Sequence, residues 1–478
     1  MIVRAAIKFT IYIPATSSSI PEQQTVIEHI HIAIMSALTS SRKPENRLSE
    51  ILPPLIFGCA TFNYQYNADP YQLDTTGLVQ EALELGVRAF DTSPYYGPSE
   101  ELLGAALDTE YVRSKLHRED FYILTKCGRI ASEEFDYSKE SVYLSVKRSL
   151  KRLRTDYLDV VYCHDVEFVS DDEVLEAVNE LRRIRNEEGT IKYIGISGYP
   201  VDVLCRLAKR ILHETGEPLD IVMSYANFTL QNTLLASYGI KELKEAGVDV
   251  VPNASPLGMG MLRRGGIPIG SMGDWHPSSS GLRAAVNDAS DFCDSHGERL
   301  EVVAIRYALE QWITIGESVG SRGDPASGVP WERKSISELF GEKKMGVSVM
   351  GVSKKEELEK TLQVWRSILD GLEDGKETCR KAGRWARDHE WSLNRKHAVE
   401  ILSGGIKEQL DGWLDHAWDS PSPDYVRRKA AAKAEEKEQL AVDSAIATPT
   451  SGSSVVKPSA VEAAIEAATP IAPVATIA

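Results

Sequence analysis

Short apolar runs and amphipathic stretches alternate along most of this chain. Apolar residues recur at helical spacing over 75–85, 139–153, 201–212 and 356–369. Gly86, Gly189 and Gly247 each follow a helical stretch and precede an apolar run, where helices commonly end. Eight mainly apolar runs are bounded by polar or turn-forming residues and predict strands, at 55–61, 87–91, 121–126, 157–164, 191–197, 219–225, 248–254 and 346–353.

This alternation predicts an α/β fold. Strands that alternate with helices imply a parallel sheet joined by crossover helices. Eight strands is the number that closes a (β/α)8 TIM barrel. A doubly wound open sheet is the alternative, but no predicted strand is followed by a GxGxxG turn. The pattern therefore favours the barrel.

The rest of the chain is divided around this barrel, which we assign to residues 51–376. Residues 1–50 show no clear period and predict an N-terminal extension. The Gly-, Ser- and Pro-rich stretch 316–345 predicts a long, disordered loop, and as a helix-to-strand connection it should leave the barrel away from the chemistry. Residues 377–426 predict a C-terminal helical appendage able to pack on the barrel, and 427–478, without aromatic residues, predict a disordered tail. The appendage holds Trp385, Trp391, Trp413 and Trp418.

Composition narrows the class of protein. An apolar fraction of 42% with 26% charged residues is ordinary for a soluble globular protein. A net charge of −16 argues against nucleic acid as a partner. The six cysteines form no CxxC pair, which suits reduced thiols in a cytosolic protein and predicts no metal site. The uncharged run 9–21 is too short to span a membrane and contains Pro14. We expect a cytoplasmic protein; a mitochondrial transit peptide is the alternative, because residues 1–21 hold Arg4 and Lys8 but no acid.

Polar side chains stand at the ends of three predicted strands. Asp91 ends the second one and is followed by a turn with two tyrosines, in the run FDTSPYYGPSEE over 90–101. Lys126 ends the third strand and His164 ends the fourth. Enzymes built on parallel barrels keep their chemistry at these carboxyl ends, so the four residue types form one candidate site.

This combination suits hydride transfer. A carbonyl that accepts hydride needs a proton, and an alcohol that loses hydride must release one. Free tyrosine has a pKa of ~10, too high for this exchange near neutral pH. The Lys126 ammonium should lower the pKa of the phenol, while Asp91 holds the lysine in place. His164 can donate a hydrogen bond that orients the substrate oxygen.

Each residue also has a purely structural interpretation. Asp91 can cap a turn, the tyrosine can belong to that turn, Lys126 can be a surface lysine, and His164 can be a hydrogen-bonded core histidine. Any one of them alone is more often structural. Four of them in order at successive strand ends favour catalysis.

The run FDTSPYYGPSE, followed by Lys126 and His164, closely resembles the aldo-keto reductase family over about residues 51–370. The family pattern places its catalytic tyrosine directly before a glycine, which matches Tyr96 rather than Tyr95. The resemblance implies a (β/α)8 barrel, a nicotinamide cofactor and a catalytic set formed by Asp91, Tyr96, Lys126 and His164.

The resemblance also implies where the cofactor binds. In the family's Ser-Asn pair, which holds the nicotinamide carboxamide, this chain keeps the serine but has Gly198 in place of the asparagine. Met223 stands where many relatives have glutamine, and Ala254 stands where they have an aromatic ring that stacks on the nicotinamide. The implied cofactor-binding residues are Ser197, Ser224 or Asn227, Ser255, Leu257, Gly258, Gly351, Ser353 and Glu357.

Glu357 bears on the choice between NAD and NADP. Relatives that prefer NADP carry an arginine near this position, whereas a carboxylate repels a 2′-phosphate and accepts hydrogen bonds from a free ribose. Lys354 and Lys355 act against this preference. The alternative is that Glu357 is a first-turn acid that favours the helix dipole. We expect NAD, with NADP as the second choice.

Departures from the wider family resemble a subgroup that contains fungal NAD-dependent D-arabinose 1-dehydrogenases and plant L-galactose dehydrogenases. These departures are Gly198 and Ala254, and the Ser224–Tyr225 pair supports the same subgroup. The opening LPPLIFGCATFN at 52–63 and the TLQN run at 229–232 resemble the fungal members. The resemblance implies oxidation of an aldose at its anomeric hydroxyl to a lactone. Two alternatives stay open: an NADPH-dependent reductase of aldehydes, ketones or pyridoxal, and a nucleotide-binding regulatory subunit. A small aldose or carbonyl compound is thus the expected partner, without nucleic acid or membrane.

Overall fold

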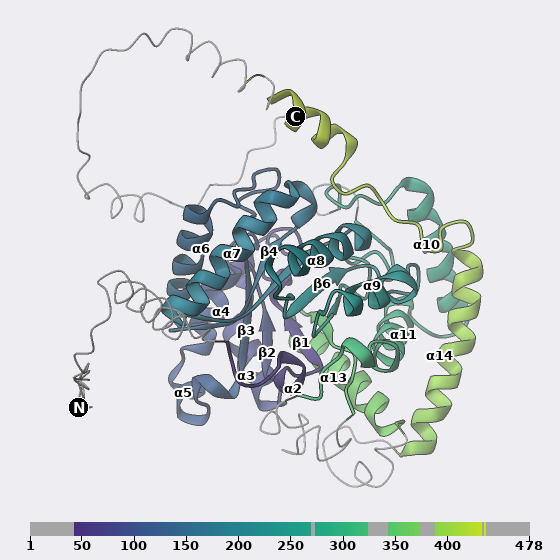
Figure 1. Cartoon of the computed structure of the whole chain (residues 1–478). Coiled ribbons are helices and arrows are strands. Elements are labelled where there is room, and N and C mark those ends of the chain that lie inside the picture. The colour runs from purple at the N-terminus through teal and green to yellow at the C-terminus, as the bar shows by residue number, and fades with distance from the viewer. Residues whose placement is uncertain (1–42, 269–272, 324–342, 373–387, 433–434, 436–478) are drawn as a thin grey trace, which may run out of the picture. The chain divides into compact units, whose positions relative to one another are not determined.

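A closed barrel of eight parallel strands forms the centre of the protein (Figure 1). The computed structural model describes residues 43–268, 273–323, 343–372, 388–432 and 435. Each strand pairs with its neighbours in chain order, and the last pairs with the first. The predicted α/β barrel is confirmed, and each predicted run overlaps one strand. The strands are β1 (Leu55–Gly58), β2 (Ala89–Asp91), β3 (Tyr122–Cys127), β4 (Leu158–His164), β5 (Ile191–Gly198), β6 (Ile221–Tyr225), β7 (Asn253–Ala254) and β8 (Ser348–Gly351).

Strand β7 is much shorter than the run 248–254 that predicts it. Pro252 lies just before the strand and has no N–H group to donate to a neighbouring strand. Upstream of the proline, Val250 still forms an isolated parallel bridge with Ile221 on β6. The proline therefore interrupts the pairing and leaves two residues as regular strand.

Helices surround the barrel and cover its outer face (Figure 1). The side chains of Asp74, Ser138 and Ser170 accept hydrogen bonds from backbone N–H groups at the starts of α3, α6 and α7. Gly86, Gly189 and Gly247 have φ angles of 85°, 71° and 74°, as expected of glycines that end helices. The helices are α3 (Thr75–Glu84), α4 (Ser99–Leu107), α5 (Glu110–Lys115), α6 (Lys139–Arg152), α7 (Asp171–Glu188), α8 (Val201–Thr215), α9 (Ile240–Glu245), α10 (Ser280–Ser295), α11 (Leu300–Ile315) and α13 (Lys355–Asp370).

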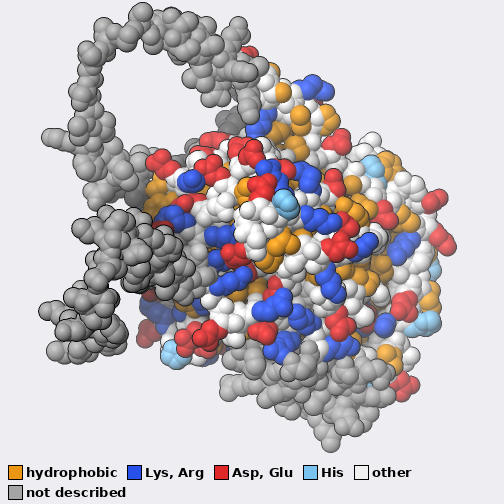
Figure 2. All heavy atoms as spheres, viewed as in Figure 1, with side chains coloured by type: hydrophobic (Ala, Val, Ile, Leu, Met, Phe, Trp, Pro, Cys, Tyr) orange, Lys and Arg blue, Asp and Glu red, His pale blue; other side chains and the backbone are white. Residues whose placement is uncertain are grey.

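The described residues show a mixed-charge surface and buried thiols. The face in Figure 2 carries acidic and basic side chains intermingled, without a large area of one sign. Within the described ranges, no helix is long and apolar enough to cross a membrane, and no group of three or more His, Cys, Asp or Glu residues is arranged to hold a metal ion. The cysteines of the described part are buried and form no disulfide, at positions 59, 127, 163, 205 and 293.

Side chains alternate along each strand between the barrel interior and the layer under the helices. On β3, Tyr122 and Leu124 belong to the interior cluster, whereas Ile123 and Cys127 pack under the helices. The same alternation places Val160 and Tyr162 of β4 inside, and it continues to the carboxyl end of each strand. This parity decides which side chains reach the interior where the strands end.

The amino end of the barrel is closed by residues 43–52, called the N-terminal plug below. Its short helix α2 (Leu48–Ile51) places Leu48 and Leu52 in the interior cluster, with exposed fractions of 1% and 0%. The prediction that residues 1–50 are an extension is therefore wrong for 43–50. The reason is that four-residue helices are too short to show a hydrophobic period.

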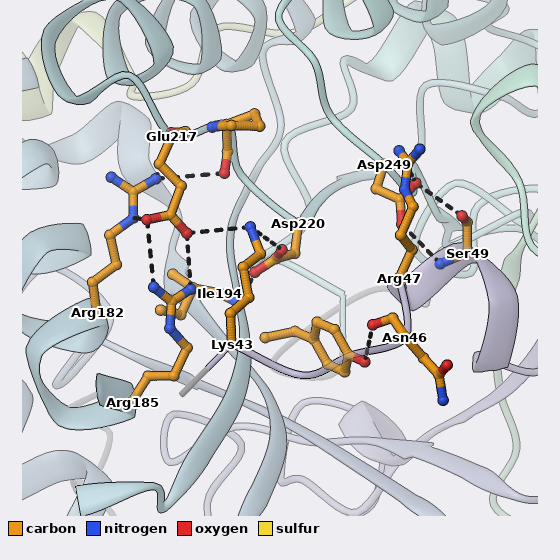
Figure 3. Close-up of polar contacts among 12 residues, drawn as sticks. Lys43, Asn46, Arg47, Ser49, Arg182, Arg185, Ile194, Glu217, Asp220 and Asp249 are labelled. Atoms are coloured by element: carbon orange, nitrogen blue, oxygen red, sulfur yellow. Dashed lines mark hydrogen bonds and ion pairs between the residues drawn. The ribbon is translucent and has the colours of Figure 1, made fainter. Parts of the chain in front are cut away.

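Polar contacts fix this plug to the ends of several strands (Figure 3). Asp249 accepts hydrogen bonds from Ser49 N at 2.9 Å and Ser49 Oγ at 2.8 Å, and it pairs with Arg47 at 2.6 Å. The Lys43 ammonium lies 3.3 Å from Glu217 and 3.5 Å from Asp220. The plug thus fills the amino end of the barrel with apolar side chains and is fixed there by ion pairs. The long loop predicted over 316–345 leaves at this end, because Arg322 N donates to Ser49 O at 3.0 Å; its residues 324–342 lie outside the described residues.

Beyond the barrel, α14 (His389–Gln409) runs along α10 and α11 (Figure 1). Val399, Ile406 and Leu410 are buried in one cluster with Leu282 and Val303 of those helices. The C-terminal appendage expected at 377–426 thus contains a long helix that packs on the barrel's outer helices. Residues 373–387, with Trp385, lie outside the described residues.

The chain falls into two units that divide between Pro421 and Ser422. In the second unit, residues 423–432 form a helix. The boundary of the predicted disordered tail, placed at 427, therefore falls inside a helix and must move towards the C-terminus. Residues 433–434 and 436–478 of that predicted tail lie outside the described residues.

Candidate active site

Asp91, Lys126 and His164 meet inside the carboxyl end of the barrel. Strand alternation turns each of them inward, since they lie two residues beyond the interior residues Ala89, Leu124 and Tyr162. Their exposed fractions are only 3%, 1% and 4%. Tyr96, in the loop between β2 and α4, remains partly exposed and joins them. The structure thus brings together all four residues predicted to be catalytic.

Lys126 is held by two partners at the end of the neighbouring strand β2. Its Nζ donates to Asp91 Oδ1 at 2.7 Å and to Thr92 O at 2.8 Å, and it lies 4.7 Å from the centre of the Tyr96 ring. A buried ammonium needs such a counter-charge. Asp91 therefore fixes the lysine under the tyrosine, as expected from the sequence.

The predicted effect on Tyr96 is wrong in direction. Burial, followed by the charges of Asp91 and Asp165, raises the pKa of the Tyr96 phenol well above its usual value. Lys126 cannot offset this, because its charge is already paired with Asp91 and it faces the ring of Tyr96. In the chain without ligands, Tyr96 is therefore a protonated phenol, suited to donate a proton.

His164 is a neutral imidazole with a defined partner on one side. Burial, with smaller contributions from Lys126 and Arg129, lowers its pKa to about 3 despite the opposing charge of Asp165. Its Nδ1 lies 3.0 Å from Ser93 Oγ, which accepts a hydrogen bond from Tyr95 N–H at 3.1 Å. The serine proton is then free to bond Nδ1, which leaves the histidine proton on Nε2. His164 is thereby arranged as a hydrogen-bond donor to an oxygen of the ligand.

A charged pair beside His164 was not predicted from the sequence. Asp165 and Arg129 form a close ion pair, and Asp165 Oδ2 lies 3.5 Å from His164 Nε2. The Arg129 guanidinium stacks 3.8 Å from the centre of the Tyr95 ring and donates to its hydroxyl at 3.1 Å. Asp165 has a φ of 56°, unusual for a residue other than glycine and often found at functional sites. The sequence signal was the acid directly after His164.

The predicted cofactor residues of β5 and β6 separate into two groups. Ser197, the next-to-last residue of β5, lies at an interior position and pairs in register with His164. Ser224 and Asn227 are 0% and 1% exposed, and Asn227 Nδ2 donates to Ser224 Oγ at 3.0 Å. The two residues are occupied with each other and with the backbone. The interior position at the end of β6 belongs instead to Tyr225, which strand alternation from Met223 indicates.

The remaining predicted cofactor residues lie at the ends of β7 and β8. Ser255, Leu257 and Gly258 form a turn closed by a hydrogen bond from Gly258 N to Ser255 O at 2.8 Å. Ser255 Oγ makes no hydrogen bond to any described residue, so it is free for a ligand. Gly258 has a φ of 58°, which glycine adopts without strain.

Gly351, Ser353 and Glu357 link β8 to α13. Glu357 Oε2 accepts a hydrogen bond from Ser353 N at 2.8 Å, a local contact of a helix start. Lys355 turns towards α3, where it lies 3.7 Å from Asp74 and 3.6 Å from Glu81. One of the two lysines that act against an NAD preference is thus engaged elsewhere. With Ser197 and Ser255, these residues occupy the β5 to β8 part of the carboxyl end. The β2 to β4 part holds Asp91, Tyr96, Lys126 and His164, called the tetrad below.

Steric crowding explains why a glycine stands at position 198. A Cβ atom at this position would lie 2.4 Å from Glu167 Oε2. Glu167 follows His164 by three residues, and its Oε1 accepts hydrogen bonds from Tyr199 N and Ser420 Oγ, both at 3.0 Å. Burial, followed by the charge of Asp165, raises the pKa of Glu167 to about 8. The space left by the absent side chain is therefore filled by this carboxyl group.

Residues 411–421, the C-terminal strap, reach back to the same end of the barrel. The Trp418 ring stacks on Tyr199, with centroids 4.5 Å apart and an interplanar angle of 10°. Gln231 Nε2 donates to Trp413 O at 2.6 Å and to His416 O at 3.0 Å. The glutamine of the TLQN run therefore holds the strap in place.

Comparison with known proteins agrees with this geometry. The sequence profile of the Aldo/keto reductase family matches residues 54–371. The chain is 42% identical over 268 residues to D-arabinose 1-dehydrogenase of Saccharomyces cerevisiae, covering 56% of this chain and 78% of that protein. It is 38% identical over 239 residues to L-galactose dehydrogenase of Arabidopsis thaliana, covering 49% and 70%. It is 25% identical over 295 residues to D-threo-aldose 1-dehydrogenase of a Pseudomonas species, covering 56% and 85%.

Proposed function

Because the chain belongs to the aldo/keto reductase family, whose members are oxidoreductases with nicotinamide cofactors, we propose that it oxidises an aldose to the lactone. The substrate would be D-arabinose or an L-galactose-like sugar, and NAD the preferred cofactor. The names of the relatives from yeast and Arabidopsis, both aldose dehydrogenases, support the substrate class.

The observation that carries this proposal is the Arg129–Asp165 pair beside His164. Asp165 Oδ1 is buried and has no hydrogen-bond partner among the described residues, and buried polar atoms normally have one. A sugar presents several hydroxyl groups next to its reacting carbon, whereas a simple aldehyde or ketone presents none. A charged pair at this place therefore favours a polyhydroxylated substrate.

The residues have distinct roles in this reaction. Tyr96 would take the proton of the anomeric hydroxyl on its phenolate oxygen, with Lys126 and Asp91 fixed beneath its ring. His164 would donate a hydrogen bond from its Nε2–H to the same substrate oxygen and so orient it, while keeping its proton. The nicotinamide cofactor, when bound, accepts the hydride that leaves C1. Ser197, Ser255, Gly258, Gly351 and Ser353 are the residues that fit its binding, since they line the other half of the barrel end.

An initial-rate assay tests the proposal. The full chain is assayed with NAD and with NADP against a panel of aldoses, and in the reverse direction with NADPH against aldehydes, ketones and pyridoxal. We expect the highest kcat/KM for an aldose with NAD. Higher kcat/KM for a simple carbonyl compound with NADPH would show a reductase, and cofactor binding without turnover on any substrate would show a regulatory subunit.

A further inference from the structure

The last interior-facing residue of each strand defines the carboxyl end of the barrel. On β2, β3 and β4 this residue is Asp91, Lys126 or His164. On β7, β8 and β1, the alternation that places Val349 and Ile56 inside leaves Ala254, Gly351 and Gly58 at this level. These three adjacent strands therefore end with no side chain larger than a methyl group. Protein atoms pack close to both glycines: a Cβ atom would lie 3.0 Å from Thr61 Cγ2 at Gly351 and 3.2 Å from Val349 Cγ1 at Gly58.

Tyr225 borders this small-residue sector. It pairs in register with Ala254 and packs against the interior cluster, and its ring is only partly buried. The Tyr199 ring packs against it, with ring centroids 5.6 Å apart and an interplanar angle of 45°. Its hydroxyl makes no hydrogen bond to a described residue. A partly exposed aromatic ring that packs against a second ring can offer a face for stacking.

Tyr225 also faces the catalytic residues. In a barrel of eight strands in chain order, β6 lies opposite β2, whose end carries Asp91 and leads into Tyr96. Asp165, which lies 3.5 Å from His164 Nε2, and its partner Arg129 are among the charged groups that act on the Tyr225 hydroxyl. Burial, followed by the charges of Asp165 and Glu167, raises the pKa of the Tyr225 phenol well above its usual value. The phenol therefore stays protonated and neutral.

Hydride transfer restricts where the cofactor ring can lie. The two carbons that exchange hydride must approach to about 3–3.5 Å, and the substrate oxygen must touch Tyr96 and His164. The nicotinamide ring therefore has to enter the carboxyl end of the barrel beside the tetrad, and the sector of Ala254, Gly351 and Gly58 is the side without bulky groups. We propose that Tyr225 stacks on the nicotinamide ring there. This inference rests on the proposed function, since it requires a nicotinamide cofactor.

Two ligands that differ only by the nicotinamide test the assignment. Dissociation constants of NAD and of ADP-ribose, which lacks the nicotinamide, are measured by calorimetry for wild type, Tyr225→Phe, Tyr225→Leu and Tyr225→Ala. Loss of one aromatic stacking partner should weaken NAD by about 5- to 100-fold in Tyr225→Leu and Tyr225→Ala, with ADP-ribose changed less than about 2-fold. Tyr225→Phe should bind both like wild type, since the ring is kept.

Controls separate stacking from a general structural role. Tyr238→Ala removes a ring that is 44% exposed on the outer surface and should change neither constant. Equal weakening of NAD and ADP-ribose by Tyr225→Leu, or no weakening of NAD, would overturn the assignment while leaving the proposed function intact. A wild-type chain that binds neither NAD nor NADP would overturn both.

Discussion

Tyr96 differs from the other members of the tetrad in being partly exposed. The buried trio can position groups and fix charges, but Tyr96 is the one placed to exchange a proton with a ligand. Its raised pKa means that the phenolate needed for oxidation is scarce near neutral pH. Until the substrate and cofactor alter that environment, the residue itself favours the acid role.

Tyr96→Phe keeps the ring and removes the proton carrier. Turnover should fall by ~100-fold or more, while the dissociation constant of the cofactor stays nearly unchanged. Steady-state rates and cofactor titration measure the two effects. Tyr95→Phe is the matched control, since it removes only the hydroxyl that bonds Arg129. If Tyr95→Phe were the damaging change and Tyr96→Phe mild, the catalytic assignment would be wrong.

Glu167 should make the stability of the fold depend on pH. Its folded pKa of about 8 lies above its ordinary value. Between about pH 4.5 and 8 the folded chain thus keeps a proton that the unfolded chain has lost, and this contribution to stability disappears as pH rises. The glutamine of Glu167→Gln does not titrate. The melting temperature of this variant should therefore rise relative to that of wild type as the pH increases from 5 to 8. Thermal melts across this range check it; a difference independent of pH would contradict the prediction.

At the scale of elements, much of the fold can be predicted from the alternation of strands with helices and from the positions of glycines. The strands were predictable because their periods are local, and so were the inward directions of Asp91, Lys126 and His164. The same alternation places Tyr225, rather than Ser224 or Asn227, at the interior position at the end of β6. The family resemblance implied Ser224 or Asn227 as the cofactor-binding residue instead. The plug and the strap depend on pairs such as Arg47–Asp249 and Gln231–Trp413, and no local pattern predicts partners so far apart.

Helix α13 carries the residue that we expect to select the cofactor. A 2′-phosphate within about 4 Å of the Glu357 carboxylate would cost ~1–4 kcal/mol, or roughly 5- to 1,000-fold in affinity. Glu357→Arg should therefore shift the ratio of kcat/KM for NAD over NADP towards NADP. The ratio is measured at fixed ionic strength, with Glu356→Arg as the control for a charge change in the same turn. A wild type that already prefers NADP would show that Glu357 does not face the ribose.

At the scale of the whole molecule, the two ends of the barrel have different tasks. The amino end is filled by the plug with Leu48 and Leu52 and sealed by Asp249. The carboxyl end holds the tetrad and the residues proposed for the cofactor. Such a division is typical of barrels in which one face stabilises and the other reacts, so changes at the plug should affect folding more than catalysis.

Leu48→Ala tests this division. Removing a fully packed leucine side chain should lower the free energy of unfolding by ~2–5 kcal/mol, while kcat/KM measured well below the melting temperature changes by less than about 3-fold. Leu393→Ala on α14, where the leucine is 40% exposed, is the matched control and should leave both nearly unchanged. A large loss of kcat/KM in folded Leu48→Ala would show that the two ends are coupled.

Because the C-terminal strap lies far along the chain, the parts of this end of the barrel are synthesised at different times. A ribosome has made all four tetrad residues once His164 has been added, but Trp418, which stacks on Tyr199, follows about 250 residues later. At the usual pace of synthesis that interval is roughly 10–50 s. A product released early, even one that includes the whole family-matched region to residue 371, carries the proton-transfer residues without the ring that covers Tyr199. Translation must therefore pass residue 420 before Trp418 can stack on Tyr199 and Ser420 can donate to Glu167, three residues after His164.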